Sequence, residues 1–241
     1  MSDAPTLPYK RILLKLSGEA LRCPGSMDNI SPEIVARIAG EIAEAQKAGV
    51  QIALVVGGGN FWRGAKASLR GMDRATADYV GMLATVMNAL ALQSALEQAK
   101  VSCIVQSAIE MKNVAEPFIR IKAREALNQG TIVIFAAGTG NPFFSTDTTA
   151  ALRASEINAD VVMKATSVDG VYDADPKKFP EAKRFDTISY QECISRQLQV
   201  MDSTSFTLCM DNKKPIIVFD MHAEGNITRA LLGASIGTTI C

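Results

Sequence analysis

The sequence predicts an α/β protein in which a mostly parallel, twisted central sheet lies between two layers of helices, a three-layer α/β/α sandwich. Two observations support this. Short apolar runs typical of buried strands alternate with helix-period segments along the chain, an order that right-handed crossovers turn into a parallel sheet covered on both faces. With 241 residues, of which 48% are hydrophobic, the chain can bury a large core, either as one domain or as two lobes that share a sheet.

The first half of the chain contains three expected strands. Residues 10–16 have a continuous apolar centre, and residues 50–56 and 101–106 repeat this pattern of a buried parallel strand. A helix is expected between the first two strands, because Ser31 can cap its N-terminus and Pro32 suits its first turn.

A long helix is expected between the second and third strands, from Asp73 to about Gln98. Asp73 can cap it, and apolar residues recur on the face that we expect to pack against the sheet. These residues are Val80, Leu83, Val86, Met87 and Leu90. Three polar positions, Asn88, Gln93 and Glu97, interrupt the helix, so it does not read as membrane-spanning.

The second half of the chain continues the alternation of strands and helices. Residues 119–128 are expected to form a helix, 131–137 a strand, 148–157 a helix and 160–165 a strand, whereas 168–176 are turn-rich and acidic and are expected to form a loop. The remaining expected elements are helices at 189–197, 202–212 and 225–232 and strands at 215–219 and 238–241.

Composition excludes several classes of function. The 25 basic and 25 acidic residues balance, so no overall positive field favours nucleic acid or an anionic membrane. The five cysteines form no C-x-x-C pair, which favours a reducing compartment, and His222 is the only histidine, so neither a zinc site nor a histidine base is expected. The first residues lack the apolar core of a signal peptide. We expect a cytoplasmic protein with no nucleic-acid or membrane partner.

Cations and glycines follow four of the expected strands, where ligands bind in open parallel sheets. In chain order these are Lys15 with Ser17 and Gly18, the glycine turn at 57–60 with Arg63, the turn at 138–147, and Lys164 with Thr166. Glycine N–H groups and helix N-termini suit phosphates. Phosphoryl transfer needs in-line positioning and positive charge, which Lys15 and Lys164 could supply while Asp147 or Asp202 orients a lysine or holds water on Mg²⁺.

Taken singly, these residues have plainer interpretations. A strand-end lysine is usually a solvated charge, and Asp78 and Asp147 each suit the first turns of a helix. Phe143 stands where a dinucleotide-binding fingerprint has its third glycine, and no Gly-Lys-Ser/Thr follows the turn. Only the joint pattern favours a site for several phosphates.

On these motifs the sequence resembles the bacterial uridylate kinases, a branch of the amino acid kinase superfamily, from Tyr9 to the C-terminus. The segments that carry the resemblance are Lys15-Leu16-Ser17-Gly18-Glu19, Gly57-Gly58-Gly59-Asn60 with Arg63-Gly64, residues 78–88, Gly138-Thr139-Gly140-Asn141-Pro142-Phe143-Phe144 through Asp147, and Lys164-Ala165-Thr166 through Tyr172. The resemblance implies the amino acid kinase fold, with residues 1–241 as one domain whose N-terminal part mainly binds the phosphate acceptor and whose C-terminal part mainly binds ATP. It implies transfer of the γ-phosphoryl group of ATP to UMP with Mg²⁺, giving ADP and UDP for pyrimidine nucleotide synthesis.

The resemblance also implies roles for individual residues, position by position. The implied ATP site consists of Lys15, Leu16, Ser17, Gly18, Gly59, Arg63, Thr166, Tyr172 and Asp175. The implied UMP site consists of Gly58, Asp78, Thr139, Gly140, Asn141, Pro142, Phe143, Phe144, Ser145 and Thr146. Catalysis is assigned to Lys15, Lys164, Arg63, Asp147 and Asp202, with no metal held by the protein alone, because the ATP phosphates carry the Mg²⁺.

Assembly and regulation follow from the same resemblance. Similar enzymes are homohexamers, and inhibition by UTP follows from its being a uridine nucleotide. Many members carry a glycine-rich loop after the first strand that is linked to activation by GTP, but Cys23-Pro24-Gly25-Ser26-Met27 stand there in this chain. The sequence therefore leaves GTP activation and the selectivity against CMP and dUMP open.

Two other functions stay open on the sequence alone. One is a kinase for a carboxylate such as acetylglutamate, although Asp78 and residues 139–144 suit a ribose and a base better than a short amino acid. The other is a nucleotide-binding storage or regulatory protein, which the presence of Lys15, Arg63, Asp147 and Lys164 argues against.

Overall fold

The strands of the protein form one large sheet and one small hairpin in the computed structural model, which describes residues 7–23, 25–176, 178–198 and 200–241. Pro24, in the stretch that replaces the glycine-rich loop, lies outside the described residues. The sheet consists of β1 Arg11–Leu16, β2 Gln51–Val56, β3 Cys103–Ser107, β4 Glu116–Pro117, β5 Ile132–Ala136, β6 Val161–Thr166, β9 Thr187–Ile188, β10 Ile216–Asp220 and β11 Thr238–Ile240. Its strand order is β4-β3-β5-β2-β1-β6-β10-β11-β9, and every described pair except β10–β11 is parallel.

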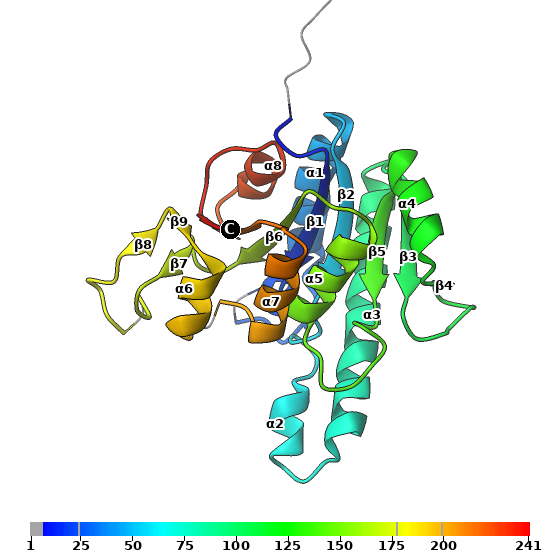
Figure 1. Ribbon diagram of the computed structural model, residues 1–241. Helices are drawn as coiled ribbons and strands as arrows, with labels where there is room; N and C mark the ends of the chain where they lie inside the picture. Colours follow the sequence, from blue (N-terminus) through cyan, green and yellow to red (C-terminus); the bar gives the residue numbers. More distant parts are fainter. Residues whose placement is uncertain (1–6, 24, 177, 199) are drawn as a thin grey trace, which may run out of the picture.

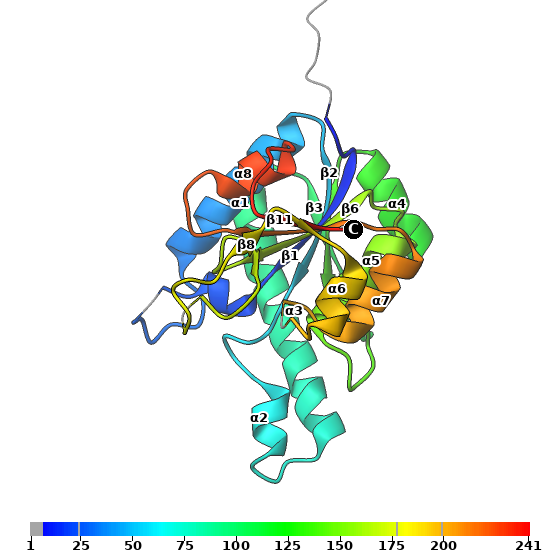
Figure 2. The ribbon, with the colours of Figure 1, turned by 60° about the vertical axis from the view of Figure 1, so that its left-hand side comes forward.

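Helices cover both faces of the sheet, as the sequence predicts (Figures 1 and 2). One layer consists of the 3-10 helix η1 Gly18–Leu21, α1 Pro32–Lys47, α3 Arg74–Gln98 and α8 Asn226–Leu231. The other consists of α4 Arg120–Asn128, α5 Thr146–Glu156, α6 Tyr190–Ser195 and α7 Ser203–Asp211. Each layer buries its own apolar cluster against the sheet. The short helix α2 Gly64–Ser68 and the start of α3 project beyond the sheet (Figure 1).

Side chains at the helix ends explain where the main helices begin. The hydroxyl of Ser31 accepts a hydrogen bond from the N–H of Ile34, and the carboxylate of Asp73 accepts one from the N–H of Thr76. Helix α5 begins at Thr146, two residues earlier than predicted, because the Ser145 hydroxyl caps it by accepting from the N–H groups of Asp147 and Thr148.

Helix α3 packs with only part of the predicted face. Val86 is buried, but Leu83 and Met87 are 50% and 46% exposed. Small residues face the glycine turn, where an added Cβ on Gly58 would stand 2.7 Å from the carbonyl oxygen of Gly81 and 2.9 Å from the Cβ of Ala84. Only small side chains allow this approach at these positions. By length and composition α3 could cross a membrane, but it packs against α1 and β3 as a helix of the core.

The acidic segment at 168–176 is not entirely a loop. Val171–Tyr172 forms β7, which pairs antiparallel with β8 Arg184–Phe185. Such two-residue strands, like β4 and β9, carry no periodicity for a sequence to display. The hairpin stands at one end of the molecule, beyond α6 (Figure 1).

The strand register places both candidate lysines on one face of the sheet. Lys15 on β1 lies opposite Lys164 on β6, and the same row continues through Val55 on β2 to Phe135 on β5. Residues in register on parallel strands point to the same side. That side carries α5 and α7, so the expectation that these strand ends meet at one edge is confirmed.

Candidate functional site

A carboxylate between two lysines forms the centre of the site. Asp147, at the start of α5, lies 2.8 Å from Lys15 Nζ through Oδ1 and 2.7 Å from Lys164 Nζ through Oδ2. Lys164 also donates to the carbonyl oxygen of Val200. Lys15 is only 7% exposed. The plainer interpretation of Lys15 and Lys164 as solvated surface charges is therefore wrong.

Burial and charge oppose each other in this cluster. Burial acts to raise the pKa of Asp147, but the two neighbouring ammonium groups outweigh it and hold that pKa below its ordinary value. For Lys164, burial and the charge of Lys15 lower the pKa, and Asp147 opposes them. The more distant carboxylate of Asp202 also acts to raise the pKa of Lys164. Two lysine ammonium groups that share the carboxylate of Asp147 in a poorly solvated place can attract a further anion.

Asp202 has a different function from Asp147. It caps α7 by accepting from the N–H of Ser205 at 2.8 Å, and it accepts from Thr148 Oγ1 at 2.9 Å and from the hydroxyl of Ser145. The carboxylate thus ties the first turn of α5 to α7. Of the two aspartates that the sequence offers, Asp147 orients the lysines, and Asp202 holds the helix that carries Asp147.

The turns after β1 and β2 meet without room for side chains. A Cβ on Gly18 would stand 2.4 Å from the carbonyl oxygen of Gly57 and 2.6 Å from Asn60 Oδ1. Asn60 is buried and pairs with Asn88 of α3, whose amide also donates to the carbonyl oxygen of Gly57 at 2.7 Å. This amide pair holds the glycine turn. Asn88 was not among the predicted site residues, because an asparagine inside a helix pattern carries no distinctive signal.

A narrow cavity of about 150 Å³ opens between the glycine turn, α3 and the turn after β5. It brings together most of the residues predicted for the acceptor. Lining residues from that set are Gly58, Asp78, Thr139, Asn141, Phe144, Ser145 and Thr146. Gly140, Pro142 and Phe143 do not line it. Six further residues on its wall were not in the predicted set: Trp62, Gly64, Gly81, Met82, Thr85 and Gly138.

The turn after β5 has an unusual backbone. Ala137, Gly138 and Gly140 have φ values of 61°, 59° and 79°, in the left-handed region that suits glycine. Neighbouring side chains hold this turn: Thr85 Oγ1 accepts from the N–H of Ala137 at 2.8 Å. Phe143, with φ 72°, donates its N–H to Asp78 Oδ2 at 2.8 Å. Phe143 is 68% exposed, and its ring lies beside Arg74, with Cζ 5.8 Å from the ring centroid.

Asp78 is held from two sides. Its carboxylate accepts from the N–H of Phe143 and forms an ion pair with Arg74 at 2.9 Å, one helical turn away. The carboxylate thereby joins α3 to the turn after β5 at the wall of the narrow cavity.

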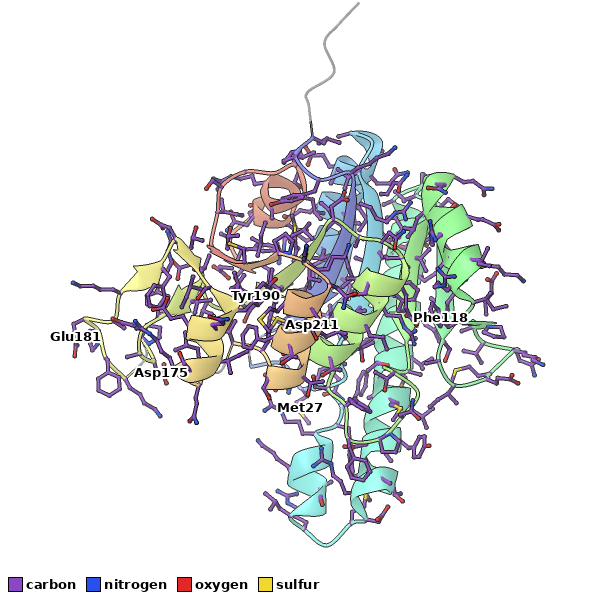
Figure 3. All side chains as sticks on the ribbon, viewed as in Figure 1. Met27, Phe118, Asp175, Glu181, Tyr190 and Asp211 are labelled. Carbon is purple, nitrogen blue, oxygen red and sulfur yellow. The ribbon has the colours of Figure 1, made fainter. Side chains whose placement is uncertain are left out.

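A second cavity, of about 580 Å³, has Lys164 on its wall. Lys164, Thr166, Tyr172 and Asp175 line it, together with other residues near the β7–β8 hairpin. Figure 3 labels Asp175 beside that hairpin. Tyr172 donates its hydroxyl to Asp169 at 2.7 Å. The volume lies in the range of small-molecule sites.

The remaining predicted residues of the ATP site do not line either of these two cavities. Arg63 pairs with Glu19 and, with Gly59, lines a neighbouring cavity beside α2 of about 360 Å³. The side chain of Leu16 is fully buried in the core, so only its backbone could meet a ligand. Ser17 precedes η1 without capping it through its side chain. Within the described part of the chain, no group of three or more His, Cys, Asp or Glu side chains could hold a metal ion.

Two cavities that both reach the neighbourhood of the Asp147 cluster suit the transfer of an anionic group between two ligands. Lys164 lines the larger cavity and Ser145 and Thr146 line the smaller one, immediately before Asp147. Lys15 and Lys164 are both bound to Asp147 and are thus held at the junction. The two lysines provide the positive charge at this place, and the arrangement does not depend on a histidine.

Comparison with known proteins agrees with this geometry. The profile of the amino acid kinase family matches residues 10–220. The chain is similar to the solved structure of UMP kinase from Bacillus anthracis, with a TM-score of 0.92, 38% identity, and coverage of 97% of this chain and 96% of that one. It is similar to UMP kinase from Ureaplasma parvum (TM-score 0.90, 34% identity, coverage 96% and 98%). It is also similar to uridylate kinase from Archaeoglobus fulgidus (TM-score 0.73, 32% identity, coverage 95% and 99%).

Proposed function

Because the chain belongs to the amino acid kinase family, we propose that it is a UMP kinase, which transfers the γ-phosphoryl group of ATP to UMP and releases ADP and UDP. The observation that carries this is the Lys15–Asp147–Lys164 cluster between two cavities, in a chain that matches UMP kinases over nearly its full length. The products supply pyrimidine nucleotide synthesis.

Each of the two substrates binds mainly to one part of the single domain. UMP occupies the narrow cavity formed by residues 58–146, and the nucleoside of ATP occupies the larger cavity formed by residues 164–218. The amides of Gly18 and Gly59 lie near the ATP phosphates, and Asp78 and the turn after β5 hold the acceptor. Trp62 and Phe144 give the narrow cavity two aromatic walls for a base.

In the reaction, a phosphate oxygen of UMP attacks the γ-phosphorus of ATP, and the bond between that phosphorus and the β–γ bridging oxygen breaks. Charge spreads over the equatorial oxygens of the transferred group and onto the leaving ADP. Lys15 and Lys164 stabilise this charge, and Asp147 holds both ammonium groups so that they need no reorganisation.

Mg²⁺ fits this site as a companion of ATP. Asp147 is engaged by two lysines and Asp202 by hydroxyl and amide donors, so neither carboxylate is available for a dedicated cage of protein ligands. Such a donor set suits a Mg²⁺ that keeps several waters and binds mainly to phosphate oxygens. When bound, the ion neutralises charge on the β- and γ-phosphates. Asp147 and Asp202 are the carboxylates that would meet its water shell.

The assembly that we propose is a homohexamer. An exposed apolar stripe on α3, formed by Tyr79, Leu83 and Met87, supports burial of this helix against another copy. UTP inhibits by occupying the acceptor site with its uridine. Activation by GTP stays open, because residues 23–27 replace the glycine-rich loop. The free cysteines agree with a cytoplasmic location.

The test is acceptor selectivity. Purified protein is incubated with Mg-ATP and, separately, UMP, CMP, dUMP, AMP, GMP and acetylglutamate, and ADP formation is followed. Turnover with UMP far above the others is expected. Turnover with acetylglutamate, or ATP binding without any turnover, would contradict the proposal and favour a carboxylate kinase or a storage or regulatory protein respectively.

A further inference from the structure

A buried arginine behind the acceptor turn takes no part in the mechanism above. Arg153 lies on α5 and is only 4% exposed. One arm of its guanidinium pairs with Glu156, Nη1 to Oε2, at 2.6 Å. A buried charge is costly unless its surroundings compensate it. Arg153 therefore needs favourable contacts in addition to its ion pair with Glu156.

Two aromatic rings hold the plane of this guanidinium. Its Cζ lies 3.7 Å from the centroid of Phe118 and 5.8 Å from that of Phe135. The two rings contact each other edge to face, with centroids 5.5 Å apart and an angle of 87°. Phe135 belongs to β5, and Phe118, labelled in Figure 3, directly follows β4. The rings restrict the direction in which the second arm of the guanidinium can donate.

That second arm is directed at the acceptor turn. Nη2 of Arg153 donates to the carbonyl oxygen of Gly138 at 3.5 Å. Gly138 lines the narrow cavity and lies next to Ala137, a non-glycine residue in the left-handed region. A backbone of this kind persists only where neighbouring groups hold it. Thr85 holds it through the N–H of Ala137, and Arg153 reaches it through the next carbonyl group.

We propose that Arg153 is a positioning residue that fixes the acceptor turn relative to Asp147, an inference that rests on the proposed function. Arg153 and Asp147 share one short helix, so the guanidinium connects the turn that holds UMP to the helix that carries the central carboxylate. The acceptor turn and the charge cluster then keep one relative position. Loss of the guanidinium weakens UMP binding and leaves ATP binding unchanged.

The experiment compares Arg153→Met and Arg153→Lys with a matched control, Arg37→Met. Arg37 also pairs with a glutamate of its own helix, Glu41 at 2.6 Å, and also donates to a backbone carbonyl group, that of Met221. Neither of its partners lines the narrow cavity. Arg153→Lys keeps a positive charge beside Glu156 but lacks the planar, two-armed donor, so it serves if Arg153→Met does not fold.

Four quantities are measured: the KM for UMP, the KM for ATP, the Kd for UMP, and the urea midpoint of unfolding. Trp62 is the single tryptophan and lines the narrow cavity, so its fluorescence reports UMP binding independently of turnover. Both Arg153 variants are expected to raise the KM and Kd for UMP about tenfold or more, the equivalent of one lost oriented hydrogen bond, and to leave the KM for ATP within about twofold. Arg37→Met is expected to lower the urea midpoint only.

The outcomes separate the two proposals. Wild-type protein that neither binds nor phosphorylates UMP overturns the proposed function and this inference with it. Wild-type protein that phosphorylates UMP, with folded Arg153 variants that bind UMP within about twofold of wild type, overturns this inference alone. Equal losses of UMP and ATP affinity in the Arg153 variants also overturn it, because they indicate general loss of packing.

Discussion

Replacing Asp147 with asparagine removes the negative charge that two buried lysines share. The side chain keeps its size, so packing changes little. Lys15 and Lys164 then face each other at the end of adjacent strands with no carboxylate between them. We expect Asp147→Asn to destabilise the folded protein strongly and to lower kcat, because the ammonium groups are no longer held in position.

The magnitude follows from the two contact distances. At 2.8 Å and 2.7 Å, and with an effective dielectric constant of about 20, each lysine attracts the carboxylate by about 6 kcal/mol. Desolvation of the three groups and repulsion between the lysines offset most of this. Removal of one partner from a buried pair typically costs about 3–5 kcal/mol, and we expect a loss in that range in the free energy of unfolding.

The assay is urea unfolding followed by circular dichroism, with Asp186→Asn as the control. The Asp186 side chain is 93% exposed and lies 3.5 Å from Arg184, so its loss should change the free energy of unfolding by less than about 1 kcal/mol. The double variant Asp147→Asn with Lys164→Met should recover part of the lost stability, because it removes one unpaired ammonium group. A loss below about 1 kcal/mol in Asp147→Asn would refute this account of the cluster.

The effect of pH has a defined sign. The folded-state pKa of Asp147 lies below its ordinary value of 3.8. Its contribution is therefore fully present above that ordinary value and is lost as the pH falls through the lower, folded-state value. The stability difference between wild type and Asp147→Asn should stay constant from about pH 7 to about pH 4.5, and should shrink only below about pH 3.8.

Three further predictions concern single side chains. Lys15→Met should lower kcat by about 10²–10³-fold while Trp62 fluorescence still reports UMP binding, and unchanged turnover would remove Lys15 from the mechanism. Gly58→Ala should lower the free energy of unfolding in urea by about 1–3 kcal/mol, because its Cβ would press on the carbonyl oxygen of Gly81. Gly40→Ala, in open space on α1, should raise it by up to about 1 kcal/mol. Equal effects of the two substitutions would contradict the packing argument. Under native conditions a thiol reagent should modify the exposed Cys23 and Cys241 quickly and the buried Cys103, Cys193 and Cys209 slowly. Burial raises the pKa of these three buried thiols to about 11, 11 and 12 respectively. Fast modification of all five thiols in a mass-spectrometric time course would contradict this prediction.

The layers of the fold and the meeting of the strand ends could be predicted, because both follow from the order of elements along the chain. A buried parallel strand reads as a continuous apolar run, and consecutive crossovers place the carboxyl ends of such strands at one edge. Lys15 and Lys164 were placed correctly for this reason. The packing face of α3 was only partly predicted: Val86 is buried as expected, but Leu83 and Met87 are exposed. The close approach of Gly58 requires small residues on this helix that hydrophobic periodicity does not mark.

Other features of the site depend on geometry that a pattern of residues does not contain. The sequence offered Asp147 and Asp202 as equals, and only the start of α5 at Thr146 placed Asp147 between the lysines. Arg153 resembled any helix arginine, because its aromatic partners come from β5 and from the end of β4. The two amides of Asn60 and Asn88 are likewise joined only in three dimensions.

The register of β1 against β6 has a consequence for how this protein can change over evolution. Lys15 and Lys164 are far apart along the chain, yet they are direct neighbours across one ladder of backbone hydrogen bonds. Their separation derives from the spacing of strands, about 4.8 Å, which no loop can alter. Insertions in the connections between these strands are compatible with an intact pair of charges, whereas deletion of one residue inside either strand would turn a lysine to the opposite face. New substrate pockets can therefore arise around a reaction centre whose own dimensions stay constant.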